Sequence, residues 1–465
     1  MPVETGQPPA PDAAVVVRTL RAAFDSDLTR DLAWRQDQLA ALERMMVENE
    51  APIAEALKAD LGKPFGEAST AEIDFVRKEA AHARKHLRRW SRPQRTAAPI
   101  AIQPGKSFIE AAPYGVTLII GAWNYPFQLV LAPLVGAIAA GNCAVIKPSE
   151  LAARSSALLK QLVERYLDPR AFAVIEGDAE VSTDLLAQRF DLIFYTGGER
   201  VGRVVMAAAA RHLTPVVLEL GGQNPCIVDE TADLAVAARR IVWGRFLNAG
   251  QVCVAPDHVY VAASVEARLL EELKRAVAAM FGHDPKQSPD FGRIVNPRHA
   301  ARLQALLADG RAVTGGQADV DACYVAPTIL TEVRANAPVM SEEIFGPILP
   351  VLPYETLETP LAAINARSPA LALYAFTKDK ATADRIIAST RSGSATINDT
   401  VVFMANPNLP FGGVGASGMG AYHGWYSFET FSHRRAVLRR GFALDASIRY
   451  PPFSKAKLAL LRRMA

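Results

Sequence analysis

The chain has 465 residues, 50% hydrophobic and 21% charged, which is longer than a single hydrophobic core usually supports and excludes an intrinsically disordered chain. A formal net charge of +3 predicts no nucleic-acid partner. Four widely spaced cysteines predict neither a metal cluster nor a disulfide framework, and a polar N-terminus without an apolar segment predicts no secretory signal. We therefore expect a cytoplasmic protein of two or three lobes.

The first part of the chain is predicted to be mainly helical. Residues 13–60 have the pattern of two amphipathic helices, and residues 74–90 continue the helical character with a strongly basic sequence. Residues 98–103 and 107–113 then look like two β-strands joined by Pro-Gly-Lys. Because this hairpin has no core of its own, we expect it to be an arm that pairs with another subunit.

Residues 116–146 contain no charged side chain and are long enough to span a bilayer. Pro126 and Pro133 would interrupt such a helix, and the segments 123–126 and 141–142 break the apolar run. A strand, a loop, a buried helix and a second strand therefore explain this stretch better than a membrane span.

From residue 116 onward, apolar strands alternate with helices, which predicts a parallel sheet covered on both faces. A second α/β pattern follows from residue 221 to about 405. The tail from residue 434 has nine Lys or Arg and one Asp. The first set of expected strands lies at 116–122, 143–148, 171–177, 192–197 and 215–222.

Ligands of parallel sheets bind beyond the carboxyl ends of the strands, where several glycines of this chain lie. Gly197 and Gly202 stand in a GxxxxG spacing between a strand and a helix. Glycine at such a turn lets a phosphate approach backbone N–H groups at the positive end of the helix. The spacing is not GxGxxG, so a simple tight turn explains it about as well.

Lys147 and Glu150 follow another expected strand. A lysine can bind ribose hydroxyls, and a carboxylate can hold a ribose diol. The alternative is helix capping, with Ser149 as the N-cap and Glu150 in the first turn. From these residues alone, capping is the better interpretation.

Glu219 lies in an apolar strand that ends at Gly221 and Gly222. Desolvation there would raise the carboxyl pKa and suit a general base. The alternative is a structural buried carboxylate, although this strand offers no cation to neutralise it.

Cys253 lies between two valines, where a cysteine most often packs in a core. The small residues 248–251 would let a substrate reach the sulfur, and a nearby helix start would favour the thiolate. A thiolate together with a base suits acyl chemistry through a thioester. Asn124, in an aromatic loop, could donate an N–H to an oxyanion.

Together these motifs resemble the NAD(P)-dependent aldehyde dehydrogenase superfamily in order and rough spacing, along nearly the whole chain. The run LPFGGVGASGMGAYHGWYSFETFSH (409–433) is similar to the class 3-like branch of fatty, aromatic and coniferyl-type aldehyde dehydrogenases. The motifs are GAWNYP (121–126), IKPSE (146–150), YTGGERVG (195–202), LELGG (218–222), NAGQVC (248–253) and EEIFGP (342–347).

The resemblance implies an α/β fold with a Rossmann-type cofactor domain, a second α/β catalytic domain and a small β-hairpin oligomerisation arm. It implies the following division: a cofactor-binding domain at 1–90 and 114–220, a catalytic domain at 221–408, the arm at 91–113 and 430–445, and a basic C-terminal tail at 446–465.

The resemblance also implies residue roles. Cys253 is the nucleophile, Asn124 and the Cys253 backbone N–H hold the oxyanion, and Glu219 activates water. Without the resemblance, Glu342 and Glu343 look like a solvated helix start. The implied cofactor-binding residues are Trp123, Lys147, Glu150, Gly197, Gly198, Gly202, Leu220, Gly221, Glu343 and Phe345.

Two positions depart from the family pattern. Gly198 stands where many relatives have Ser or Asn, so one phosphate hydrogen bond is expected to be missing. Residues 221–225 are GGQNP where GGKSP is common, which we expect to affect packing more than chemistry.

The expected reaction is oxidation of apolar aliphatic or aromatic aldehydes to carboxylic acids. NAD is the expected cofactor, with NADP possible, because Glu150 would bind a 2′-hydroxyl and repel a 2′-phosphate. A non-catalytic binding protein and acyl transfer to coenzyme A are the alternatives, and Glu219 favours hydrolysis over the latter. An aromatic substrate entrance is suggested by Trp123, Tyr125, Phe127, Trp243 and Phe246.

We expect a homodimer that binds a small-molecule aldehyde, with no nucleic-acid partner, no metal site and no integral membrane segment. The basic tail is expected to be solvated, with weak peripheral membrane contact as the alternative.

Overall fold

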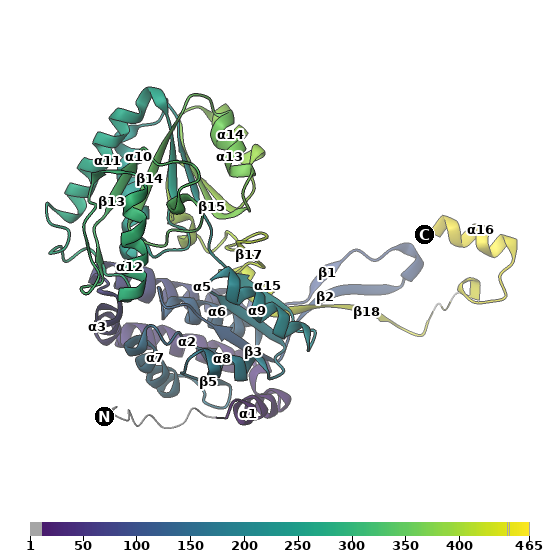
Figure 1. The fold of residues 1–465 in the computed structure, drawn as a ribbon. Helices are drawn as coiled ribbons and strands as arrows, with labels where there is room; N and C mark the ends of the chain where they lie inside the picture. The colour runs from purple at the N-terminus through teal and green to yellow at the C-terminus, as the bar shows by residue number, and fades with distance from the viewer. Residues whose placement is uncertain (1–11, 444, 446, 465) are drawn as a thin grey trace.

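The computed structural model describes residues 12–443, 445 and 447–464. Two α/β lobes lie one above the other, and an extended arm leaves the lower lobe and leads to the C-terminal helix α16 (Lys455–Met464) (Figure 1). The buried apolar residues of both lobes form one contiguous cluster.

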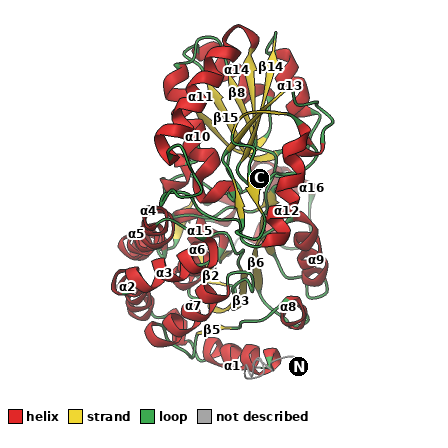
Figure 2. Cartoon of the chain, turned by 60° about the vertical axis from the view of Figure 1, so that its left-hand side comes forward, coloured by secondary structure: helices red, strands yellow, loops and turns green. Residues whose placement is uncertain are grey.

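The lower lobe contains a six-stranded sheet of order β17-β7-β6-β3-β4-β5, in which only β17 runs antiparallel to its neighbour. Helices α6 and α7 cover one side of this sheet, and α8 and α9 cover the other (Figure 2). The strands are β3 (Val116–Ile120), β4 (Cys143–Lys147), β5 (Phe172–Val174), β6 (Leu192–Thr196), β7 (Val216–Glu219) and β17 (Gly418–Met419). The helices are α6 (Gln128–Ala140), α7 (Ala153–Tyr166), α8 (Ala179–Leu186) and α9 (Glu199–Ala210).

The uncharged stretch 116–146 forms strand β3, a loop, the buried helix α6 and strand β4, which confirms the prediction. Every residue of α6 is buried, including Pro133. Within the described part of the chain, no helix combines the length and apolar character that crossing a membrane requires.

The N-terminal segment differs from the prediction of two helices in residues 13–60. It forms three: α1 (Ala13–Asp25), α2 (Leu32–Glu48) and α3 (Glu50–Leu61). The chain breaks after α1 because Asp27 is left-handed with a φ of 63°, and Asp31 then caps α2 by accepting the backbone N–H of Ala33. The expected basic helix is present as α5 (Asp74–Trp90).

The upper lobe contains a seven-stranded sheet of order β10-β13-β14-β9-β8-β15-β16, parallel except at β10. Helices α10 and α11 lie on one side of it and α13 on the other (Figure 2). Its strands are β8 (Pro225–Val228), β9 (His258–Ala262), β10 (Arg311–Thr314), β13 (Thr328–Thr331), β14 (Ile348–Tyr354), β15 (Ala370–Phe376) and β16 (Ser392–Ile397). Its helices include α10 (Leu234–Phe246), α11 (Glu266–Phe281), α12 (Pro297–Leu306), α13 (Glu358–Asn365) and α14 (Lys380–Ser389).

The arm is a three-stranded antiparallel sheet of β1 (Gln94–Thr96), β2 (Gly105–Pro113) and β18 (Ser432–Arg440). The prediction of a strand at 98–103 is wrong, since residues 100–102 form a 3₁₀ turn. Pro99 and Pro104 have no N–H to donate to a ladder, so the first strand ends at Thr96.

Candidate active site

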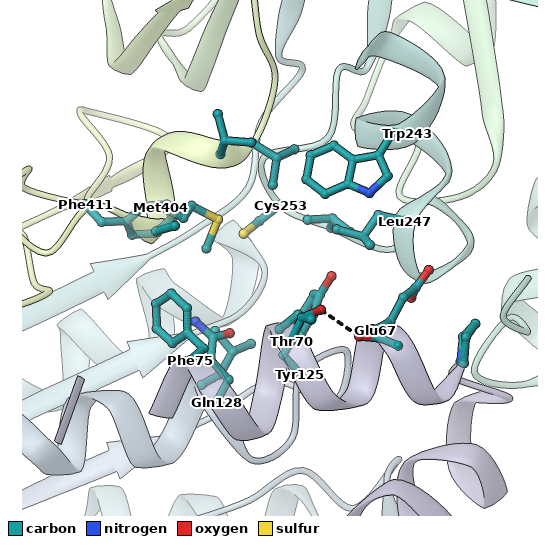
Figure 3. A pocket seen from close by; sticks show the side chains of 18 of the residues that line it. Glu67, Thr70, Phe75, Tyr125, Gln128, Trp243, Leu247, Cys253, Met404 and Phe411 are labelled. Carbon is teal, nitrogen blue, oxygen red and sulfur yellow. Dashed lines mark hydrogen bonds between the residues drawn. The ribbon is translucent and has the colours of Figure 1, made fainter. Parts of the chain in front are cut away.

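A cavity of about 550 Å³ is lined by residues of both lobes, Cys253 and Glu219 among them. Its wall is mostly apolar, and Phe75, Trp243 and Met404 point into it (Figure 3). Residues from widely separated parts of the chain therefore meet around one cavity.

Cys253 ends a tight segment that we call the nucleophile turn, residues 248–253. Burial raises the pKa of the Cys253 thiol, and Glu343 and Glu219 raise it further. The expected helix dipole is missing, because the first helical turn after Cys253 begins at Ala263. Instead, the backbone N–H groups of Cys253 and Val254 lower the thiol pKa by hydrogen bonding.

Glu219 is the last residue of β7 and is almost fully buried. Neither carboxylate oxygen has a hydrogen-bond partner among the described residues. Burial therefore raises the carboxyl pKa of Glu219 well above its usual value. This is the environment anticipated for a base, and the cation that a structural carboxylate would need is not among its neighbours in the described chain.

Asn124 is buried in the loop between β3 and α6. Its side-chain amide donates one hydrogen bond to the carbonyl oxygen of Gln251, at 3.0 Å, which ties it to the nucleophile turn. An amide has two N–H groups, so one remains for an oxyanion.

The segment that begins at Lys63 was missed by sequence reasoning. The Lys63 ammonium lies 2.6 Å from the Glu72 carboxylate and donates to the carbonyl oxygen of Asn124 at 2.9 Å. Glu72 in turn accepts the N–H groups of Phe127 and Gln128 at the start of α6. No spacing in the sequence signals this arrangement, because its members lie in two segments that are about 50 residues apart in the chain.

Glu67 lies on the same segment and points toward the cavity (Figure 3). It is the last residue of the short helix α4 (Phe65–Glu67) and precedes a six-residue π-helix, Ala68–Ile73. Burial raises the pKa of Glu67 to about 7, although Lys63 and a backbone hydrogen bond from Asn248 oppose the change.

Lys147 and Glu150 lie at the carboxyl end of β4. The Lys147 ammonium is buried, donates to the carbonyl oxygen of Pro148 at 2.7 Å, and lies 3.8 Å from the half-exposed Glu150 carboxylate. Burial lowers the pKa of Lys147, and Glu150 opposes this shift. A buried cation beside an accessible carboxylate fits a ribose with its free hydroxyls.

The helix-capping interpretation of this stretch is wrong. Helix α7 begins only at Ala153, and its first N–H groups donate to the carboxylate of Asp60, from Arg154 and Ser155. The Ser149 hydroxyl accepts the N–H of Leu151, within a turn that precedes α7.

The glycines after β6 divide into two kinds. A Cβ on Gly197 would collide with the Tyr195 hydroxyl, and one on Gly202 would lie 2.9 Å from Leu220. Gly198, the N-cap of α9, has no atom within 4 Å of the corresponding position. Gly198 therefore borders open space at the positive end of a helix, where a phosphate fits.

Glu343 lies against Gly221, where a side chain would collide with its carboxylate. The N–H of Gly222 donates to this carboxylate, yet Oε1 is buried and has no hydrogen-bond partner among the described residues. Burial raises the pKa of Glu343 to about 8. An unsatisfied buried oxygen is suited to accept a ribose hydroxyl.

The aromatic residues that were expected at the substrate entrance lie partly at the cavity and partly in the core. Trp123 contacts Phe345, with ring centroids 5.4 Å apart, while Tyr125 and Trp243 line the cavity. Phe127 and Phe246 are fully buried, so their expected place at the substrate entrance is wrong. Leu220 lines the cavity next to Glu219.

Comparison with known proteins gives consistent matches over the chain. The model of the aldehyde dehydrogenase family matches residues 5–437. The dimeric, NADP-preferring aldehyde dehydrogenase of Rattus norvegicus is 46% identical over 444 residues, covering 95% of this chain and 98% of that protein. Aldehyde dehydrogenase family 3 member B1 of Homo sapiens is 45% identical over 447 residues, covering 96% of each chain.

A solved structure agrees with these matches. The substrate-bound state of Staphylococcus aureus AldH superimposes with a TM-score of 0.95 at 43% identity, covering 97% of this chain and 98% of that one. The α/β fold and the resemblance carried by the six motifs are thereby confirmed. The chain belongs to the aldehyde dehydrogenase family, in its class 3-like branch, and is an NAD(P)-dependent oxidoreductase.

Proposed function

We propose that the protein oxidises apolar aliphatic or aromatic aldehydes to free carboxylic acids through a thioester on Cys253. The observation that carries this proposal is that Cys253 and Glu219 line the same cavity. Glu219 ends strand β7 of the lower lobe, whereas Cys253 lies between strands β8 and β9 of the upper lobe. A nucleophile and a base of raised pKa on one dry cavity are the two groups that such a reaction needs.

In the first step, the Cys253 thiolate attacks the aldehyde carbon, forming a C–S bond while the carbonyl π electrons move to oxygen. The resulting oxyanion accepts hydrogen bonds from the free N–H of the Asn124 amide and from the Cys253 backbone. Because Gln251 holds the Asn124 amide at 3.0 Å, this donor is oriented before the substrate binds.

The residues that would hold the dinucleotide are Lys147 and Glu150 at the adenosine ribose, Gly198 at the pyrophosphate and Glu343 at the nicotinamide ribose. The open space at Gly198 and the unsatisfied Glu343 oxygen support this assignment. The dinucleotide, when bound, accepts the hydride that leaves the former aldehyde carbon.

In the last step, Glu219 takes a proton from water as the water oxygen bonds to the thioester carbon. The C–S bond then breaks, Cys253 leaves as a thiolate and the acid is released. A neutral carboxyl cannot act as the base, so Glu219 carries this step in its ionised form. Transfer of the acyl group to coenzyme A would need no such base.

The cavity wall supports the choice of substrate class. Phe75, Phe281, Met280, Met404 and Phe411 line the approach to Cys253. Apolar side chains of this size favour alkyl and aryl groups over hydrated polar ones.

NAD is the proposed cofactor, and NADP is accepted less well. The accessible Glu150 carboxylate supports this order, because it would repel a 2′-phosphate. The rat relative is named as NADP-preferring, which makes the second cofactor worth measuring.

We also propose a homodimer in a reducing, cytoplasmic compartment. The exposed arm of β1, β2 and β18, which projects away from both lobes, supports pairing with a second subunit (Figure 1). All four cysteines are free, which suits a reducing environment.

The test is a kcat/KM series over aliphatic chain lengths and aromatic aldehydes with both dinucleotides. We expect turnover to free acid without coenzyme A, and loss of at least about 1,000-fold in Cys253→Ala with dinucleotide binding retained. Coenzyme A-dependent product, or turnover that survives Cys253→Ala, would contradict the proposal.

A further inference from the structure

The nucleophile turn is held in an unfavourable backbone conformation. Asn248, Ala249 and Gly250 are consecutive residues with φ values of 50°, 52° and 76°. Ala disfavours this left-handed region, whereas Asn and Gly adopt it more readily, and three consecutive residues in it persist only when the surroundings fix them. The position of Cys253, three residues later, therefore depends on what fixes the turn.

Part of the support comes from within the upper lobe. The Gln251 side-chain amide donates to the carbonyl oxygens of Asn248 and Arg293, both at 2.9 Å, and accepts the N–H of Val295 at 3.0 Å. These bonds fix the end of the turn that is nearer to Cys253.

The start of the turn is held by Glu67, which is 181 residues away in the chain. The Glu67 carboxylate accepts the backbone N–H of Asn248 at 2.9 Å. The Asn248 side chain then donates to the carbonyl oxygen of Asn124 at 2.9 Å, an atom that also accepts from Lys63. Hydrogen bonds thus connect Glu67 to the nucleophile turn and, through the Asn248 side chain, to the backbone carbonyl of Asn124.

The segment that carries Glu67, residues 63–72, is held in place by buried contacts. Lys63 is almost fully buried, pairs with Glu72 and lies 3.9 Å above the Tyr125 ring. Since Glu72 also binds the start of α6, residues 63–72 are fixed to the loop that holds Asn124. Glu67 is therefore a fixed support and not a freely moving surface side chain.

We propose that Glu67 is a positioning residue, whose carboxylate sets the nucleophile turn and so the placement of the Cys253 thiol relative to the Asn124 amide. This rests on the proposed role of Cys253. The hydrogen bond that carries it needs an acceptor at this position and not a negative charge.

The experiment compares Glu67→Met, which keeps the length of the side chain but removes the acceptor, with Glu67→Gln, which keeps an acceptor without the charge. Glu55→Met is the matched control, because it makes the same change at an exposed glutamate of α3 that does not line the cavity. Two quantities are measured in each full-length variant. One is the rate at which iodoacetamide alkylates Cys253, read by mass spectrometry of its peptide, and the other is kcat and KM for a short and a long aldehyde.

We expect Glu67→Met to lower both the alkylation rate and kcat by about 10- to 100-fold. KM should change little, and by the same factor for the short and the long aldehyde. Glu67→Gln and Glu55→Met should stay within about threefold of the parent protein. If thermal unfolding shows that Glu67→Met is not folded, Glu67→Ala serves for the same comparison.

Unchanged alkylation in Glu67→Met, or KM values that shift with aldehyde length, would overturn the proposal and make Glu67 a substrate contact. Failure of Glu67→Gln to restore alkylation would also overturn it. Because alkylation needs no turnover, a parent protein that oxidises no aldehyde would refute the proposed function and leave this test intact.

Discussion

Glu219 raises the pKa of the Cys253 thiol across the cavity that the two residues share. Burial raises the pKa of both groups, so each favours its protonated form at rest. In the proposed mechanism, the thiol has to lose its proton before attack, and the carboxyl has to lose its proton before hydrolysis. The two groups that the proposed mechanism uses therefore both resist ionisation.

The rate of aldehyde oxidation should accordingly rise with pH. Since both essential groups have raised pKa values, the active ionised forms become more populated as the pH increases from about 6 to 9. We expect kcat/KM to increase over this range, measured by dinucleotide reduction with correction for substrate stability. A profile that falls with pH would contradict the requirement for deprotonation.

Replacing the base should stop the reaction after its first half. In Glu219→Gln, the amide cannot accept a proton from water, so the thioester should accumulate after one burst of reduced dinucleotide. We expect the steady-state rate to fall by about 100-fold or more, while the burst amplitude stays close to one per site. Stopped-flow absorbance and intact-protein mass spectrometry measure the two quantities, and an unchanged steady-state rate would refute the role of Glu219.

Much of the fold could be predicted, because apolar strands and polar helices alternate with clear periods. Strand β15 is hard to predict, since its sequence of Ala and Leu residues also suits a helix and only burial between β8 and β16 decides its form. The break between α1 and α2 depends on the left-handed Asp27, which has no strong sequence signal.

Residues of the candidate site could be predicted only where a short sequence motif contains them. The structure brings Cys253 and Glu219 to one cavity as the motifs suggested. Glu67 and Lys63 could not be found in this way, because each acts through a backbone atom of a segment far away. A hydrogen bond to a backbone group of a distant segment produces no sequence motif from which it could be predicted.

Gly198 should tolerate a serine and bind the dinucleotide more tightly with it. The position borders open space and is the N-cap of α9, where serine is at least as favourable as glycine. In Gly198→Ser, the hydroxyl adds a donor for the pyrophosphate, and we expect a severalfold lower Kd for NAD by calorimetry. Gly202→Ser is the control, because its side chain would meet Leu220 and should weaken binding or stability.

Glu150 should determine the choice between the two dinucleotides. Its carboxylate is half-exposed, so Glu150→Gln removes the repulsion of a 2′-phosphate without a large structural change. We expect the ratio of kcat/KM for NADP over NAD to increase by about 5- to 10-fold at low salt and less at high salt. An unchanged ratio would show that the 2′-position lies away from Glu150.

A buried glutamate outside the site should make stability depend on pH. Glu79, on α5, is 5% exposed, and its carboxylate accepts the backbone N–H of Gly424. Burial raises the pKa of Glu79 to about 7, from 4.5. A group with a raised folded-state pKa favours folding fully below the unfolded pKa, and this stability is lost as the pH rises toward 7.

The variant Glu79→Gln keeps an acceptor for Gly424 but does not ionise. Relative to this variant, the parent protein should therefore lose stability between about pH 4.5 and 7, by up to about 3 kcal/mol from the linked proton. Thermal unfolding at pH 5 and pH 8 measures the difference, with the exposed Glu164→Gln on α7 as the control for removing a charge. If the parent and Glu79→Gln keep the same difference in Tm at both pH values, the Glu79 carboxyl is not protonated in the folded protein at pH 5 to 7.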